Sequence, residues 1–160
     1  MGLYLQKKID FYRILWYNYS MKYYTLIVFL TIVAALEGSE TGKVSHHATL
    51  LAAMCEVESN GDCSKIGKVG ELGCYQIREC FWIDALEHDP SIGGVYEDVI
   101  NREYAEKCIL AYWDRYATEK RLNRPVTDED RARMHNGGPN GYKKTKTIKY
   151  WNKIQNELRN

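Results

Sequence analysis

The chain lacks any strong excess of one charge, because its 160 residues carry 22 Lys and Arg against 21 Asp and Glu. A net charge near zero gives the whole molecule no preference for nucleic acid or for an anionic surface. The sequence also has no internal repeat and no low-complexity tract, which excludes collagen-like, repeat and disordered classes. What remains is the composition of one ordinary globular domain.

The spacing typical of zinc sites is missing as well. Neither a CxxC nor an HxxxH pattern occurs, so we expect no metal site and no cofactor. The number of cysteines is odd, which leaves at least one of them outside any internal disulfide bond. Two bridges among five cysteines can be drawn in 15 ways, and the sequence does not choose among them. These cysteines are Cys55, Cys63, Cys74, Cys80 and Cys108.

No uncharged run is long enough to span a membrane. The longest one, Tyr23 to Leu36, has 14 residues, fewer than the ~20 that a spanning helix needs. It follows Met21 and Lys22 and ends before Glu37, which is the pattern of a cleaved signal peptide. We therefore expect an N-terminal extension with a signal peptide at 1–38, with Met21 as a possible true start, and one domain at 39–160. The alternative is a signal anchor, which residues 1–20 would favour if they are translated.

Hydrophobic periodicity predicts a mainly helical domain. Apolar residues at three- and four-residue steps indicate helices at 46–59, 102–118 and 148–158, with shorter ones at 80–87 and 127–136. The glycine-punctuated stretch 64–77 favours a small hairpin or an extended loop. The expected fold class is α+β, with several helices around one short β-hairpin.

Glu58 is the first candidate for chemistry. It is predicted to end the first helix, where the negative end of the helix dipole and the neighbouring Met54 and Val57 favour its protonated form. A neutral carboxylic acid is what a general acid needs to protonate a glycosidic oxygen. An isolated Glu-Ser pair is more often a solvated surface feature. The surrounding motifs therefore decide whether Glu58 is a candidate for catalysis.

Those motifs resemble the invertebrate-type lysozymes, also called the destabilase family. The run HNGGPNG followed by YWNK is the most specific part, and the general spacing is also similar to lytic transglycosylases and goose-type lysozymes. The resemblance implies a lysozyme-like fold and cleavage of the β-1,4 bond between N-acetylmuramic acid and N-acetylglucosamine in peptidoglycan, with Glu58 as the acid. The matching segments are CEVES (55–59), GELGCYQI (70–77), FWIDA (81–85), EKCILAYWDRYA (106–117) and ARMHNGGPNGYKKTKTIKYWNKIQ (132–155).

One catalytic residue of that family is absent here. The family has an Asp about a dozen residues after the Glu, and Gly70 occupies that distance in this chain. Glu71 is the nearest carboxylate, with Asp62 behind it. Glu71 could serve as a nucleophile at ~5 Å from Glu58, or as a base for water at ~6.5 to 9.5 Å, or it could be an exposed turn residue. A mechanism with a single Glu, by water attack or internal ring closure, is a further alternative.

Several polar and aromatic residues are candidates for holding the sugar. Tyr75 offers a ring for stacking, as do Trp82, Tyr142 and Trp151, although the two tryptophans lie in helical patterns that favour packing. Gln76, His135 and Asn136 could hydrogen-bond acetamido groups. Isopeptidase activity, credited to some members of the family, would need a nucleophile such as Ser59 or Ser64 beside His135, and no spacing enforces that pair.

The sequence thus predicts a secreted, monomeric muramidase that acts on bacterial peptidoglycan in antibacterial defence or bacterial digestion. It predicts neither a nucleic-acid partner nor stable membrane association after cleavage of the signal. The alternatives are a glycan-binding protein that has lost catalysis and a disulfide-supported structural domain. Residues 131–160 carry 8 basic side chains against 1 acidic, so a basic C-terminal segment from Arg131 to Lys149 is expected to draw the protein to anionic cell walls.

Overall fold

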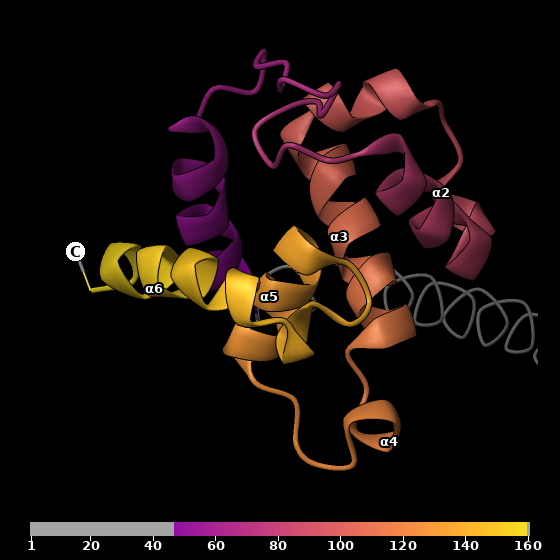
Figure 1. The fold of residues 1–160 in the computed structure, drawn as a ribbon. Coiled ribbons are helices and arrows are strands. Elements are labelled where there is room, and N and C mark those ends of the chain that lie inside the picture. The colour runs from indigo at the N-terminus through magenta and orange to yellow at the C-terminus, as the bar shows by residue number, and fades with distance from the viewer. Residues whose placement is uncertain (1–46, 160) are drawn as a thin grey trace, which may run out of the picture. The chain divides into compact units, whose positions relative to one another are not determined.

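The computed structural model describes residues 47–159 (Figure 1). The predicted signal peptide and the extension before it lie outside these residues. The first described helix covers residues 47–59. It is followed by α2 (Glu79–His88), α3 (Arg102–Tyr116), α4 (Glu119–Leu122), α5 (Asp128–Gly137) and α6 (Ile148–Glu157), with the short 3-10 turns η1 (Pro90–Ile92), η2 (Tyr96–Ile100), η3 (Gly141–Lys143) and η4 (Thr145–Thr147).

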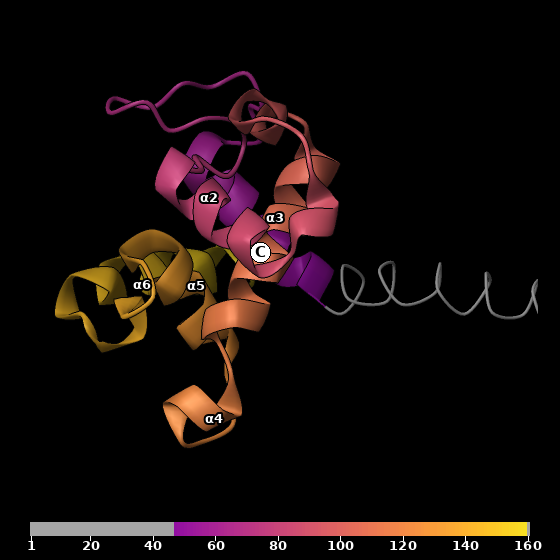
Figure 2. The same cartoon turned by 90° about the vertical axis from the view of Figure 1, so that its right-hand side faces the viewer.

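Helix α3 forms the centre of the domain. It packs against α2, η2 and α5, and α5 in turn packs against α6. Figures 1 and 2 both show α2 beside α3 and α5 beside α6. The predicted helices are confirmed within one or two residues of their expected bounds because their apolar stripes meet in one core. Fully buried members of that core include Leu51, Met54, Cys108, Ile109 and Ile154.

The predicted β-hairpin is not confirmed. In its place, Leu72 forms isolated antiparallel bridges with Ile66 and with Ile77, and residues 47–159 contain no longer strand. Gly70 and Gly73 interrupt the extended chain with φ values of +90° and +77°. A Cβ at Gly73 would lie 2.5 Å from the carbonyl oxygen of Val99, so this turn needs glycine. The described domain is therefore mostly helical.

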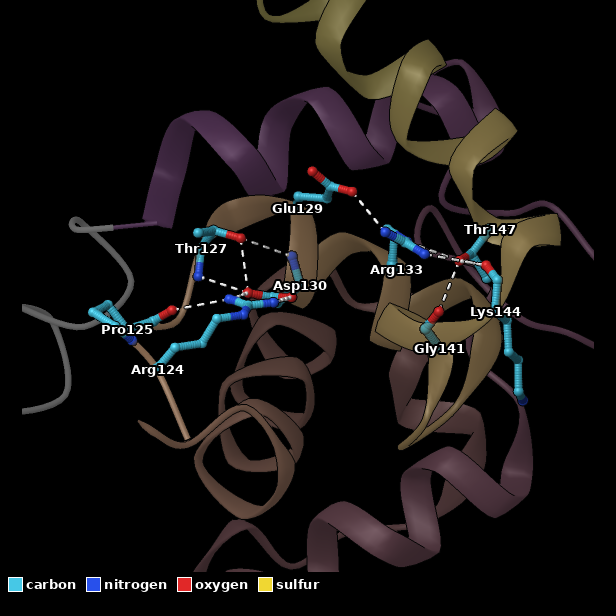
Figure 3. Close-up of polar contacts among 9 residues, drawn as sticks. All are labelled: Arg124, Pro125, Thr127, Glu129, Asp130, Arg133, Gly141, Lys144 and Thr147. Atoms are coloured by element: carbon cyan, nitrogen blue, oxygen red, sulfur yellow. Dashed lines mark hydrogen bonds and ion pairs between the residues drawn. The ribbon is translucent and has the colours of Figure 1, made fainter. Parts of the chain in front are cut away.

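Helix α5 begins with the capping box that the sequence predicted. The Asp130 backbone N–H donates to the Thr127 hydroxyl, and the Asp130 carboxylate accepts from the Thr127 backbone N–H at 3.0 Å. The same carboxylate, only 3% exposed, accepts two 2.7 Å hydrogen bonds from Arg124 (Figure 3). Burial raises the pKa of Asp130, but the hydrogen bonds from Arg124 and Thr127 outweigh it and lower the pKa overall.

Arg133 fixes the glycine-rich loop that follows α5. Its guanidinium donates to the Thr147 hydroxyl at 3.0 Å and to the Lys144 carbonyl oxygen at 3.2 Å, and Thr147 donates to the carbonyl oxygen of Gly141 at 2.8 Å (Figure 3). A Cβ at Gly141 would lie 1.9 Å from the Arg133 carbonyl oxygen. Only glycine allows this close approach, which brings the loop back against the end of α5.

All five cysteines carry free thiols in the structure. Burial, together with the neighbouring thiols of Cys63 and Cys55, raises the pKa of Cys74, whereas Cys80 is exposed and Cys108 is buried in α3. Disulfide bonding therefore stays a prediction. Among residues 47–159, no helix combines the length and the apolar character needed to cross a bilayer.

Candidate active site

A cleft of about 650 Å³ lies between the end of the helix 47–59, the loop that follows it, α2 and the C-terminal end of α5. Its walls are polar and carry charges of both signs. The lining side chains that matter for chemistry are Glu58, Glu71, Gln76, Arg78, His135, Asn136, Lys144 and Lys146.

Glu58 is held at the C-terminal end of its helix. The next residue, Ser59, is buried, and its hydroxyl lies 2.9 Å from the carbonyl oxygen of Cys74 and 3.1 Å from that of Cys55. The Lys65 ammonium donates to the Glu58 backbone carbonyl. These contacts join the helix end to the loop, and they leave the Glu58 side chain 19% exposed on the cleft.

His135 is the nearest imidazole to that carboxylate. Its Nε2 lies 2.9 Å from the carbonyl oxygen of Tyr75 and 3.8 Å from Oε1 of Glu58. A carbonyl oxygen can only accept, so Nε2 carries the proton in the neutral ring. Burial lowers the pKa of His135, and the opposing effects of Glu58 and the Tyr75 carbonyl do not cancel this. His135 is therefore a neutral N–H donor near neutral pH.

Aromatic rings form an apolar wall beside His135. Phe81 of α2 stacks on Tyr112 of α3, with ring centroids 3.8 Å apart. Phe81 also makes an edge-to-face contact with the His135 ring, with centroids 5.3 Å apart. Both Phe81 and Tyr112 line the cleft. These rings are mostly buried, so they pack behind His135 and help to hold it in place.

Glu71 shares the cleft with Glu58. Its carboxylate lies 3.0 Å from the Arg78 guanidinium and accepts from the Val69 backbone N–H at 3.1 Å. Burial raises the pKa of Glu71, but the hydrogen bonds from its own backbone N–H, from Arg78 and from Val69 outweigh it and lower the pKa. A Cβ at Gly67 would lie 2.3 Å from the carboxylate, so this glycine makes room for it. Glu71 is thus an ionised group on the cleft wall.

Asp62, the other candidate, does not line the cleft. Its carboxylate accepts from the Ser64 hydroxyl at 2.6 Å and from the Ser64 backbone N–H at 2.9 Å. These two hydrogen bonds lower the pKa of Asp62. Of the two candidates, Glu71 is the one that lines the same cavity as Glu58. Asp84 of α2 also lines it, and its carboxylate accepts from the Tyr116 hydroxyl at 2.9 Å.

The predicted sugar-binding residues have different positions. Asn136 is exposed on the cleft wall, and Gln76 lines the cleft while its amide nitrogen donates to the Gly73 carbonyl oxygen at 2.9 Å. Tyr75 is fully buried, with its hydroxyl 2.6 Å from Glu106, so its ring has no face for a sugar. It takes part in the site through its backbone carbonyl, which accepts from His135.

No serine is paired with His135 among the described residues. Ser59 is engaged with backbone carbonyl groups, and Ser64 is engaged with Asp62. The imidazole hydrogen-bonds to Tyr75 instead. The arrangement therefore gives no support to isopeptidase chemistry by a Ser-His pair.

Sequence reasoning missed several residues of the site. Arg78 lies on none of the motifs. Phe81 and Tyr112 lie in segments that match the family, but nothing in those segments indicates that the two residues line the cleft, because their positions depend on how the loop, α2 and α3 pack. Lys144 and Lys146 do line the cleft, and the basic C-terminal segment was the signal for them. Other members of that segment are engaged elsewhere: Arg131 pairs with Asp128, Arg133 pairs with Glu129, and Lys143 lies over Tyr142.

Known proteins are similar to this chain in sequence and in fold. The Destabilase family model matches residues 47–157. The chain is 39% identical over 110 residues to an invertebrate-type lysozyme of Ruditapes philippinarum, an alignment that covers 66% of this chain and 76% of the relative. It is 38% identical over 111 residues to a lysozyme of Meretrix lusoria, covering 66% and 84%.

Solved structures of lysozymes are similar to this chain in fold as well. The chain resembles the Meretrix lusoria lysozyme, in complex with Aeromonas hydrophila PliI, with a TM-score of 0.58 and 34% identity over 68% of this chain and 87% of the other. It resembles Tapes japonica lysozyme with a TM-score of 0.55 and 35% identity, covering 67% and 86%.

The fold, the cleft that holds Glu58 and the similarity to solved lysozymes together place the domain in the class of lysozyme-like glycoside hydrolases. The chain belongs to the Destabilase family, that of the invertebrate-type lysozymes. This membership confirms the resemblance stated from the sequence, together with the lysozyme-like fold and the lysozyme function.

Proposed function

We propose that this lysozyme hydrolyses the β-1,4 bond between N-acetylmuramic acid and N-acetylglucosamine in peptidoglycan, with Glu58 as the general acid. The observation that carries this is the shared cleft of Glu58 and Glu71, in which Glu71 is kept ionised beside Arg78. Protonated Glu58 gives its proton to the glycosidic oxygen as the bond to the anomeric carbon breaks. The cleaved sugar leaves with a new hydroxyl group.

Glu71 takes the role of the family's absent Asp in this proposal. It either attacks the anomeric carbon to form a glycosyl ester, which water then hydrolyses, or it removes a proton from an attacking water. The first route retains the anomeric configuration and the second inverts it. NMR of the freshly formed reducing end distinguishes the two routes.

The other residues of the site would position the substrate. Asn136 and the side-chain oxygen of Gln76 are placed on the cleft to hydrogen-bond acetamido groups, and His135 orients Glu58. Lys144 and Lys146 would attract the carboxylates of the cell wall, an effect that salt weakens. We further propose that the mature domain, residues 39–160, is secreted as a monomer and acts in defence against bacteria or in their digestion.

A glycan-binding protein without catalysis is the second candidate, and the absence of the family's Asp at Gly70 favours it. Incubation of the wild-type chain with purified insoluble peptidoglycan separates the two functions. The lysozyme releases reducing ends with time and clears a bacterial suspension. Sedimentation of the chain with peptidoglycan, without any release of reducing ends, would instead establish the binding protein.

A further inference from the structure

Two lysines on the wall of the cleft have no carboxylate to neutralise them. Lys144 and Lys146 both line the cleft, and no carboxylate among residues 47–159 lies within ion-pair distance of either ammonium group. The lining as a whole holds four cationic side chains against three carboxyl groups, so positive charge is left for an anionic ligand. The cations are Lys68, Arg78, Lys144 and Lys146, and the acids are Glu58, Glu71 and Asp84.

Two of these acids already have partners of their own. Glu71 lies 3.0 Å from the Arg78 guanidinium. The Asp84 carboxylate accepts from the Tyr116 hydroxyl at 2.9 Å and lies 3.4 Å from Arg115. An anionic group on a ligand is therefore the partner that the cleft itself does not supply to the two lysines.

Lys144 is fixed in position at both ends. Its ammonium group donates to the carbonyl oxygen of Gly137, the residue after Asn136 at the end of α5. Its own carbonyl oxygen lies 2.7 Å from the Thr147 hydroxyl and accepts from Arg133 at 3.2 Å (Figure 3). Thr147 is fully buried, and a Cβ at Gly137 would lie 2.6 Å from its methyl carbon, so the segment is tightly packed. The ammonium group thus stays on the cleft wall with two N–H bonds left for a ligand.

We propose that Lys144 and Lys146 form a carboxylate-binding subsite, which makes the enzyme prefer N-acetylated glycans that carry a carboxylate over neutral ones. This inference rests on the proposed cleavage of peptidoglycan. The N-acetylmuramic acid of peptidoglycan carries a lactyl group, whose carboxyl group is either free or joined to a stem peptide with carboxylates of its own. Chitin oligosaccharides have N-acetylated sugars without any carboxylate. Ammonium and carboxylate groups form charge-assisted hydrogen bonds, which supply the preference.

The double variant Lys144→Gln, Lys146→Gln removes both charges from the subsite. Its kinetics are measured on a chitin oligosaccharide, on a peptidoglycan glycan strand with free lactyl groups, and on the same strand with stem peptides. The carboxylate lies away from the bond that breaks, so the subsite acts on KM rather than kcat. We expect the KM of a carboxylate-bearing strand to rise about fivefold relative to that of the chitin oligosaccharide, since exposed ion pairs are individually weak. A rise for the strand with free lactyl groups identifies the lactyl carboxylate as the ligand, and a rise only for the other strand identifies the stem peptide.

Two control variants separate the subsite from a general effect of charge. Lys144→Arg with Lys146→Arg keeps both charges and should keep the wild-type preference. Lys107→Gln with Lys120→Gln removes two exposed charges outside the cleft and should also keep it. An unchanged KM ratio in the Lys144 and Lys146 glutamine variant would overturn the proposal, and so would an equal loss of preference in the Lys107 and Lys120 variant.

A binding measurement separates the subsite from the proposed hydrolysis. The disaccharide in which N-acetylglucosamine is linked β-1,4 to N-acetylmuramic acid lacks the bond that is cut, and chitobiose is its neutral counterpart. Calorimetry with the full chain should show tighter binding of the acidic disaccharide, a difference that added salt and the glutamine double variant both reduce. That result would support the subsite even if the chain cleaves no glycan. Equal binding of the two disaccharides, or binding of neither, would refute the subsite even if peptidoglycan hydrolysis is confirmed.

Discussion

His135 and Glu58 lie side by side on the cleft, with Nε2 of the imidazole 3.8 Å from a carboxylate oxygen. The same N–H lies 2.9 Å from the carbonyl oxygen of Tyr75. One neutral imidazole therefore joins α5 to the loop that follows Glu58.

Acid should destabilise the fold through His135. Burial lowers the pKa of His135 below the ~6.5 of the unfolded chain, so the unfolded state takes up the proton first. The free energy of unfolding that neutral His135 contributes is complete above pH ~6.5. It is lost as the pH falls toward the lowered pKa, at up to ~1.4 kcal/mol per pH unit. Urea unfolding between pH ~6.5 and ~5 measures this slope.

The variant His135→Gln should have a smaller slope in that range, because no proton is taken up on unfolding at this position. The matched control is His88→Gln, which changes an exposed histidine and should keep the wild-type slope. Equal slopes in the wild type and in His135→Gln would contradict the buried, neutral histidine.

Glu71 and Asp62 should differ in their importance for catalysis. Glu71→Gln removes the ionised carboxylate that shares the cleft with Glu58 and is paired with Arg78, and it is expected to lower turnover about 100-fold, within the usual range for a lost acid-base or nucleophilic group. Asp62→Asn changes a carboxylate outside the cleft and should remain within about twofold of the wild type. Rates of reducing-end release from peptidoglycan test the pair, and the reverse ranking would identify Asp62 as the replacement for the family's Asp.

The capping carboxylate of α5 should matter for stability. Asp130→Asn weakens the contacts with Arg124 and Thr127 at a site only 3% exposed, and we expect a loss of about 2 kcal/mol in the free energy of unfolding at pH ~7. Asp128 lies two residues earlier, in the first turn of α5, and its side chain is 54% exposed. Asp128→Asn should therefore lower the free energy of unfolding by less than about 0.5 kcal/mol. Chemical denaturation compares the two, and similar losses would show that burial at Asp130 is unimportant.

Local signals in the sequence predicted much of this structure. The apolar stripe of α3 and the Thr127–Asp130 capping box depend on residues three or four apart, and both are confirmed. The position of Glu58 at a helix end is equally local. The burial of Tyr75 was not predictable in this way, because its hydroxyl partner Glu106 lies 31 residues further along the chain.

The pairing around the cleft depends on the tertiary fold. His135 and the Tyr75 carbonyl are 60 residues apart, and nothing in either motif specifies their contact. The conformation of the loop that was expected to be a hairpin also depends on tertiary packing. The chain turns at Gly73 because the Val99 backbone lies against it there. Family resemblance drew attention to the HNGGPNG run, but it did not indicate which of its residues line the cleft.

Oxidation should form one disulfide bond that includes Cys74. The neighbouring thiols of Cys63 and Cys55 help to raise the pKa of Cys74, and Cys74 can bond to only one of them. Thiol titration of the oxidised, denatured chain should then find three free thiols, five minus the two in the bridge. Peptide mapping should place Cys74 in the bridge, and Cys80→Ser should form it equally well. Five free thiols after oxidation would contradict the prediction.

The acid role of Glu58 is tested most directly by the variant Glu58→Gln, which keeps the shape of the side chain and removes its ability to give up a proton. Reducing-end release from purified peptidoglycan is measured alongside sedimentation with the same material. We predict that the variant sediments as the wild type does but releases reducing ends at least about 100-fold more slowly. Release at the wild-type rate would contradict the assignment of Glu58 as the general acid.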